Sequence, residues 1–197
     1  MVLQIFREAV RAGCEEEYAR IEERRAQASA ELRCPHPHAA LVTVDRPLEV
    51  WWLNAFESDA DRERVEAAYA ANRALMDALE RDSPQKAALT TSVVNTYARF
   101  RAQVSGASAI PPMGGRFWAV AVMREELTLA GAVFEDSSGM RFVFAPASTR
   151  RGAEDQAAAI GNEAHVLAVR PEWGMPAESW VLADPEFWAV SPSARRR

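Results

Sequence analysis

The chain has 197 residues, 49% of them hydrophobic, and a formal net charge of −5. A chain of this length can bury a sizeable core without a metal or a disulfide, as one large domain or two small ones. Acidic residues and arginines are interspersed, so no basic stripe is available to neutralise a nucleic-acid backbone, and nucleic acid is not expected as a partner. No apolar run approaches the roughly 18 residues of a membrane span, which predicts a soluble, cytoplasmic protein without a membrane partner.

Lysine usage is the most unusual feature of the composition. Lys86 is the only lysine, and every other basic residue apart from histidine is an arginine. Together with abundant alanine, this usage is typical of a GC-rich bacterial genome. We therefore interpret it as ancestry and not as function.

Hydrophobic periodicity predicts one β-α-β-β-α-β unit in the first hundred residues. Three acidic residues at 15–17 suit the positive end of a helix dipole, and Ser58 with Asp61 forms a capping box that opens the second helix. The expected elements are strand 2–7, helix 14–33, strands 39–45 and 48–57, helix 58–80 and strand 89–101. Two helices would then cover one face of a four-stranded antiparallel sheet, an α+β arrangement of the ferredoxin-like kind.

The strand at 48–57 is apolar on both faces. Successive residues of a strand point to opposite faces, so Trp52 and Phe56 share one face while Trp51 and Leu53 share the other. A strand of this kind is normally covered on both sides. One face would meet the helices, and something else must cover the other.

The rest of the chain is predicted to form a smaller, strand-rich α+β domain. Serine, glycine and proline are concentrated at 103–115, which indicates a linker. The expected elements after it are strand 117–123, hairpin strands at 130–135 and 140–145, helix 150–160, strand 164–170 and a short helix from Pro176. We therefore expect domains at 1–102 and 116–190 and a frayed tail at 191–197, with no internal sequence repeat.

The order of elements resembles that of the dimeric α+β barrel superfamily, as does the run EVWWLNAFES at 49–58, which leads into a helix with an acidic first turn. Within that superfamily, the antibiotic-biosynthesis monooxygenase and NIPSNAP-like groups are the most similar. The resemblance covers residues 1–102. In such proteins the sheet face away from the helices curls against a partner's sheet and the enclosed space holds a ligand. The resemblance thus implies a homodimer that binds a small apolar or aromatic molecule.

A second arrangement would cover the same sheet face without a partner. Residues 103–190 could pack over the open face within one chain, as an intramolecular substitute for the second subunit. An exposed apolar sheet face must be covered in one of these ways. In the corresponding alternative function, the protein is a non-catalytic structural or interaction protein whose sheet face serves only dimerisation or the seating of the second domain.

Four aromatic and amide residues are the candidate ligand-binding residues: Trp52, Asn54, Asn72 and Tyr97. Some members of the resembled group use such side chains to bind a planar phenolic substrate that reacts with oxygen without a cofactor. Large aromatic side chains usually serve packing, so the two amides are the better indication, because a buried amide needs a partner or a ligand. We therefore expect a cofactor-independent oxygenase or a related enzyme, with no bound cofactor.

A third hypothesis is a metal-dependent enzyme. Cys34, His36 and His38 carry thiol and imidazole groups at alternate positions, which point the same way on an extended chain. The set lacks a fourth ligand, and its spacing matches no closed zinc pattern. The alternative interpretation is a rigid connector, because Pro35 and Pro37 break the helix before the next strand.

Overall fold

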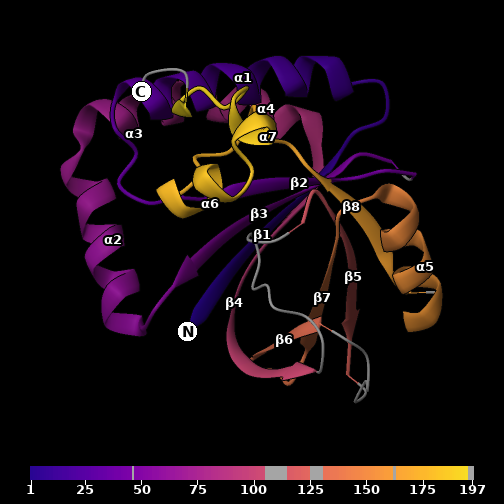
Figure 1. Ribbon diagram of the computed structural model, residues 1–197. Coiled ribbons are helices and arrows are strands. Elements are labelled where there is room, and N and C mark those ends of the chain that lie inside the picture. Colours follow the sequence, from indigo (N-terminus) through magenta and orange to yellow (C-terminus); the bar gives the residue numbers. More distant parts are fainter. Residues whose placement is uncertain (46, 105–114, 125–130, 162, 195–197) are drawn as a thin grey trace.

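A computed structural model describes residues 1–45, 47–104, 115–124, 131–161 and 163–194. These residues form a closed barrel of antiparallel strands in the order β1-β3-β2-β8-β5-β7-β6-β4 (Figure 1). The strands are β1 (Val2–Val10), β2 (Ala39–Thr43), β3 (Glu49–Phe56), β4 (Thr90–Val104), β5 (Phe117–Met123), β6 (Gly131–Asp136), β7 (Arg141–Ala147) and β8 (His165–Val169). The helices are α1 (Glu15–Glu31), α2 (Asp59–Ala71), α3 (Arg73–Arg81), α4 (Ser83–Leu89), α5 (Arg150–Ile160), α6 (Glu178–Ala183) and α7 (Pro185–Trp188).

The helix predicted at 58–80 is two helices. Asn72 leaves the helical conformation, with φ −89° and ψ 72°, and its side chain accepts a hydrogen bond from the backbone N–H of Leu75 at the start of α3. The same side chain donates to the carbonyl oxygen of Leu32, 2.8 Å away, just after α1. α3 ends at Arg81, and Pro84 lies in the first turn of α4, where a residue without a backbone N–H is tolerated.

The second half of the chain has the same strand order as the first. The order β8-β5-β7-β6 matches β4-β1-β3-β2 when β5 to β8 are taken as equivalents of β1 to β4. Only residues 124–130 separate β5 from β6, whereas the 17-residue helix α1 separates β1 from β2. The expectation of an unlike second domain beside a ferredoxin-like one is therefore corrected: both halves contribute strands to one barrel. Residues 105–114 of the predicted linker lie outside the described residues.

Two strand pairs join the halves into the barrel. β4 pairs with β6, with Phe100 opposite Phe134, and β2 pairs with β8, with Leu41 opposite Val169. The sheet face that the helices leave open is thus covered by the second half of the same chain. Of the two arrangements considered from the sequence, the intramolecular one describes this barrel.

The barrel interior is filled by aromatic side chains. Trp51, Trp118, Phe134 and Phe144 are fully buried there. Phe144 makes edge-to-face contacts with the other three at centroid distances of 6.1 to 6.4 Å. Such pairs add about 0.5–1.5 kcal/mol each beyond the area they bury. The predicted alternation of the strand at 48–57 is confirmed, because Trp51 points into the barrel and its neighbour Trp52 points to the outside.

Helices cover the outside of the barrel. Helices α1, α3 and α4 lie along the outer side of the first-half strands, and α5 packs against β5, β7 and β8 (Figure 1). Tyr18 and Ile21 of α1 form a second apolar cluster with Val10, Val50 and Trp173. None of the helices in the described part of the chain is long and apolar enough to cross a membrane.

Candidate functional site

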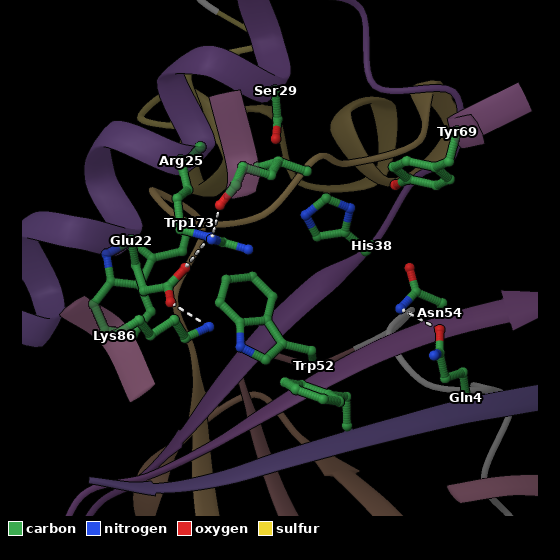
Figure 2. A pocket seen from close by; sticks show the side chains of 13 residues that line it. Gln4, Glu22, Arg25, Ser29, His38, Trp52, Asn54, Tyr69, Lys86 and Trp173 are labelled. Atoms are coloured by element: carbon green, nitrogen blue, oxygen red, sulfur yellow. Dashed lines mark hydrogen bonds and ion pairs between the residues drawn. The ribbon is translucent and has the colours of Figure 1, made fainter. Parts of the chain in front are cut away.

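A pocket, here called the outer pocket, lies between the outer face of β1 and β3 and the helices that cover it (Figure 2). It encloses about 190 Å³, which is the liquid volume of roughly six water molecules. That size suits a molecule of one or two rings. The outer pocket is lined by Gln4, Phe6, Glu22, Arg25, Ala26, Ser29, His38, Trp52, Asn54, Tyr69, Leu79, Lys86 and Trp173.

Strand alternation explains which strand residues reach the outer pocket. Gln4 and Phe6 are alternate residues of β1, and Trp52 and Asn54 are alternate residues of β3. The two strands pair so that Gln4 lies opposite Asn54 and Phe6 opposite Trp52. All four side chains therefore share the outer face, while Leu53, between Trp52 and Asn54, points into the barrel.

Helical spacing supplies the opposite wall. Glu22, Arg25 and Ser29 are separated by three and four positions on α1, so they share one helix face. Lys86 reaches the pocket from α4, which follows α3 in the same layer. Trp173 comes from the segment after β8 and stacks beside Trp52 at a centroid distance of 6.5 Å.

One end of the outer pocket is charged. Lys86 Nζ lies 2.6 Å from Glu8 Oε2 and 2.6 Å from Glu22 Oε1, and all three side chains are at most 10% exposed. Arg25 Nε lies 3.7 Å from Glu22 Oε2. Removing an ion from water costs several kcal/mol, so buried charges persist only when they are paired. These groups form one coupled cluster and not separate surface ion pairs.

Aromatic groups surround the same cation. Lys86 Nζ lies 5.4 Å from the ring centroid of Tyr18 and 5.6 Å from that of Trp52, within the range of cation-π attraction. The Tyr18 hydroxyl and the Trp52 Nε1–H both donate to Glu8 Oε2, over 2.7 and 3.1 Å. Burial raises the pKa of Tyr18, and the adjacent carboxylates add to the effect. Burial also raises the pKa of Glu22, against the ion pair with Lys86 that lowers it.

The other end of the outer pocket carries amides. Asn54 Nδ2 donates to Gln4 Oε1 over 3.2 Å, and Gln4 Nε2 donates to Asn95 Oδ1 over 3.1 Å, which forms a ladder across β3, β1 and β4. Figure 2 shows the Asn54 side-chain oxygen pointing away from Gln4, toward the side where His38 and Tyr69 lie. Asn54 therefore offers the pocket a hydrogen-bond acceptor, suited to a hydroxyl or amine of a ligand.

Three uncharged groups adjoin the amide end. Cys34 Sγ lies 2.8 Å from the Tyr69 hydroxyl and 3.9 Å from His38 Nδ1. Burial lowers the pKa of His38 to about 4 and raises the pKa of the Cys34 thiol. Burial also raises the pKa of Tyr69, and the neighbouring thiol adds to the shift. At neutral pH the three groups are therefore uncharged hydrogen-bonding partners, in contrast to the charged cluster at the far end.

The predicted metal ligands do not converge. Cys34 and His38 approach each other, but the His36 ring stacks on Phe56 instead, at a centroid distance of 4.7 Å and an interplanar angle of 13°. The chain bends at residues 35 and 36, so the alternation of an extended strand does not apply to this segment. In the described parts of the chain, no group of three or more His, Cys, Asp or Glu residues is arranged to hold a metal ion.

The outer pocket brings together two of the four predicted ligand residues, Trp52 and Asn54. Asn72 uses its side chain at the junction of α1 and α3, as described above. Tyr97 is 37% exposed on β4 and donates to Glu66 Oε1 over 3.2 Å. These two residues do not line the pocket.

The charged end of the pocket was not predicted from the sequence. Lys86 is conspicuous in the sequence, because it is the only lysine in a chain that otherwise uses arginine. The scarcity of lysine was interpreted as ancestry, but the one lysine lies between two buried carboxylates, a position that suits a compact ammonium group better than a guanidinium group. Glu22 lies four residues after Tyr18 on the buried stripe of α1, and Glu8 shares strand parity with Phe6. Helical and strand periodicity could therefore have indicated that both carboxylates lie in the layer between the helices and the sheet.

The fold and the pocket define a single-chain α+β barrel with a cavity under its outer helices. No protein-family model and no curated protein matches this chain. Among solved structures, a putative monooxygenase from Fusobacterium nucleatum is similar over 85% of this chain and 91% of its own length, with a TM-score of 0.54 and 9% identity. That likeness shows the shared fold.

Two further solved structures are more weakly similar. A putative monooxygenase from Lactobacillus acidophilus matches with a TM-score of 0.45 and 10% identity, over 85% of this chain and 93% of its own. A NIPSNAP family protein from Agrobacterium tumefaciens matches with a TM-score of 0.37 and 19% identity, over 49% of this chain and 82% of its own. The resemblance to the superfamily that holds these groups is thus confirmed at the level of the fold, on the Fusobacterium structure.

Proposed function

We propose that this protein binds a small planar aromatic molecule in the outer pocket and oxygenates it with O₂, without a bound cofactor. The observation that carries the proposal is the make-up of the pocket wall, in which Trp52 and Trp173 provide ring surfaces and Asn54 provides an acceptor beside them. Pockets for small molecules typically combine apolar and aromatic walls with a few placed polar groups. The Fusobacterium structure of similar fold, which is named a putative monooxygenase, agrees with this reaction class.

The pocket residues have defined roles in this proposal. The ring of the substrate lies against Trp52, and its hydroxyl donates to Asn54 Oδ1. His38 is uncharged at neutral pH because burial holds its pKa near 4, so it provides a neutral hydrogen-bonding group beside the substrate. Lys86 also lines the pocket, and its ammonium group would stabilise negative charge that develops on the ring during the reaction.

A suitable probe is 2-naphthol, a two-ring phenol. Its oxygenation to 1,2-naphthoquinone consumes one O₂, places one oxygen atom on the ring and releases the other as water. The ring supplies the electrons, so no reductant or cofactor is needed. Enzyme would be assayed aerobically by oxygen electrode, with the quinone measured by chromatography, and the binding step measured separately by calorimetry.

The variant Asn54→Leu tests the binding step. Loss of one hydrogen bond from a ligand hydroxyl weakens binding by about tenfold. The matched control is Tyr97→Phe, which removes a hydroxyl on the same sheet face but outside the pocket and leaves the affinity within about twofold. Equal affinity of wild type and Asn54→Leu for 2-naphthol would contradict the site. Binding without oxygen uptake would contradict the reaction and leave a binding protein.

The homodimer stays a prediction. The barrel closes within one chain, so a second copy is not required to cover the inner sheet face. Light scattering coupled to gel filtration measures the mass in solution and compares it with 21.8 kDa for one chain.

A further inference from the structure

The outer pocket has two chemically different ends. Figure 2 shows Glu22, Arg25 and Lys86 on one side of Trp52, and Asn54 with Gln4 on the other. A ligand whose hydroxyl reaches Asn54 and whose ring covers Trp52 therefore extends toward the two cations. The group at that end of the ligand decides whether these cations contribute to binding.

The charged end has no net charge of its own. Lys86 and Arg25 balance Glu8 and Glu22 when all four are ionised. The two carboxylates differ in the groups that stabilise their negative charge. Glu8 Oε2 accepts from Tyr18, from Trp52 and from Lys86, over 2.6 to 3.1 Å.

The ionised form of the Glu22 carboxylate is stabilised by the two cations alone. Its neighbours in the protein are Lys86 from α4, Arg25 and Tyr18 from its own helix, and Glu8 from β1. Of these, only the two cations favour its ionised form, and Glu22 is 1% exposed. A ligand anion that takes over these cations therefore removes the interactions that keep Glu22 ionised.

We propose that the outer pocket selects aromatic molecules that carry a carboxylate opposite their hydroxyl, and that this carboxylate binds Lys86 and Arg25 while Glu22 takes up a proton. The inference rests on the proposed function, because it uses the same pocket, and it names the class of ligand: a hydroxylated aromatic acid. Proton uptake keeps the buried charges balanced, since the anion brings one negative charge and protonation of Glu22 removes one.

The test compares two ligands on the unmodified protein. The ligand 6-hydroxy-2-naphthoate carries the hydroxyl and the carboxylate at opposite ends of the ring system, and 2-naphthol lacks the carboxylate. Calorimetry at pH 7 gives both affinities. Repeating each titration in phosphate and in Tris, which differ in heat of ionisation, gives the number of protons taken up.

The acid is expected to bind at least about tenfold more tightly than 2-naphthol, the gain of one charge-assisted hydrogen bond. One proton is taken up with the acid and none with 2-naphthol. The methyl ester of the acid, which has the same size without the charge, is expected to bind no more tightly than 2-naphthol.

Other results separate the two proposals. If 2-naphthol binds and the acid binds no more tightly, the charged end does not select carboxylates and the inference is overturned, while the proposed binding function stands. If neither binds, the proposed function fails and the inference with it. Tighter binding of the acid without proton uptake would overturn the role of Glu22.

Two variants check the assignment to residues. Lys86→Met is expected to abolish the preference for the acid over its ester. Glu22→Gln, which is uncharged from the start, is expected to keep the preference and lose the proton uptake. Because the ligand comparison uses the unmodified protein, the proposal stays testable if Lys86→Met does not fold.

Discussion

The two faces of strand β3 carry very different chemistry although their residues alternate along one strand. Trp51 and Leu53 face a barrel interior filled by apolar side chains. Trp52 and Asn54 face a cavity of about 190 Å³ that is lined by buried Lys86 and Glu22, with the buried carboxylate of Glu8 paired to the same lysine. The inner face has the composition of a core, whereas the outer face keeps charges that a core would exclude.

This difference separates stability from function in one sheet. Buried apolar packing stabilises a fold, whereas a buried ion cluster contributes little net stability compared with apolar residues of the same size. Such a cluster is therefore a feature to be explained by what it binds or positions. Substitutions on the inner face should change stability most, and substitutions in the outer pocket should change binding most.

The largest expected effect is on the inner face. Trp51→Ala leaves a cavity beside Phe144 and is expected to lower the free energy of unfolding by about 3–5 kcal/mol, measured in urea. The milder variant Trp51→Phe should keep the affinity for 2-naphthol within about twofold. A loss of affinity with Trp51→Phe at nearly unchanged stability would break the division between the two faces.

The charged cluster should give the next largest effect. Lys86→Met leaves Glu8 and Glu22 buried without their shared cation, which is expected to cost about 3 kcal/mol of stability at pH 7. Adding Glu22→Gln to the same chain removes one uncompensated charge and should recover part of that loss. Urea unfolding of the single and double variants measures the stability lost in Lys86→Met and the part recovered when Glu22→Gln is added. An unchanged stability in Lys86→Met would show that the lysine is not buried between the carboxylates.

His38 should make stability depend on pH at the amide end. Its pKa is about 4 in the fold, against an ordinary value near 6.5, so the unfolded chain binds the proton first. The favourable contribution is complete above about pH 6.5 and is lost as the pH falls toward 4. Between pH 7 and pH 5 the wild type should lose about 1–2 kcal/mol more than His38→Gln. Parallel pH dependence of the two proteins would contradict the burial of this imidazole.

The smallest expected effect distinguishes Asn72 from Asn54, both of which were predicted from the sequence as candidate ligand-binding residues. Asn72→Ala removes a helix cap and the bond to the Leu32 carbonyl, and is expected to lower stability by about 1 kcal/mol. Its affinity for 2-naphthol should match that of the wild type, because the side chain lies outside the pocket. Thermal unfolding and calorimetry measure the two quantities. Weaker binding in this variant would extend the site toward α3.

Local patterns in the sequence account for much of the fold and part of the site. Alternation predicted that Trp51 and Trp52 lie on opposite sheet faces, and the order of elements predicted the first half of the barrel. The sequence could not show that the second half completes the same barrel, because pairs such as Phe100 with Phe134 depend on strand pairing and not on local pattern. The cluster at Lys86 was equally hidden, since its members are far apart along the chain.

The most direct test of the division between the two faces is a crystal structure of the protein with 2-naphthol bound. We predict electron density for the ring against Trp52, with its hydroxyl within hydrogen-bond distance of Asn54 Oδ1. Density inside the barrel, among Trp51, Trp118 and Phe144, would contradict the account, because it would place the ligand in the region identified here as a packed core.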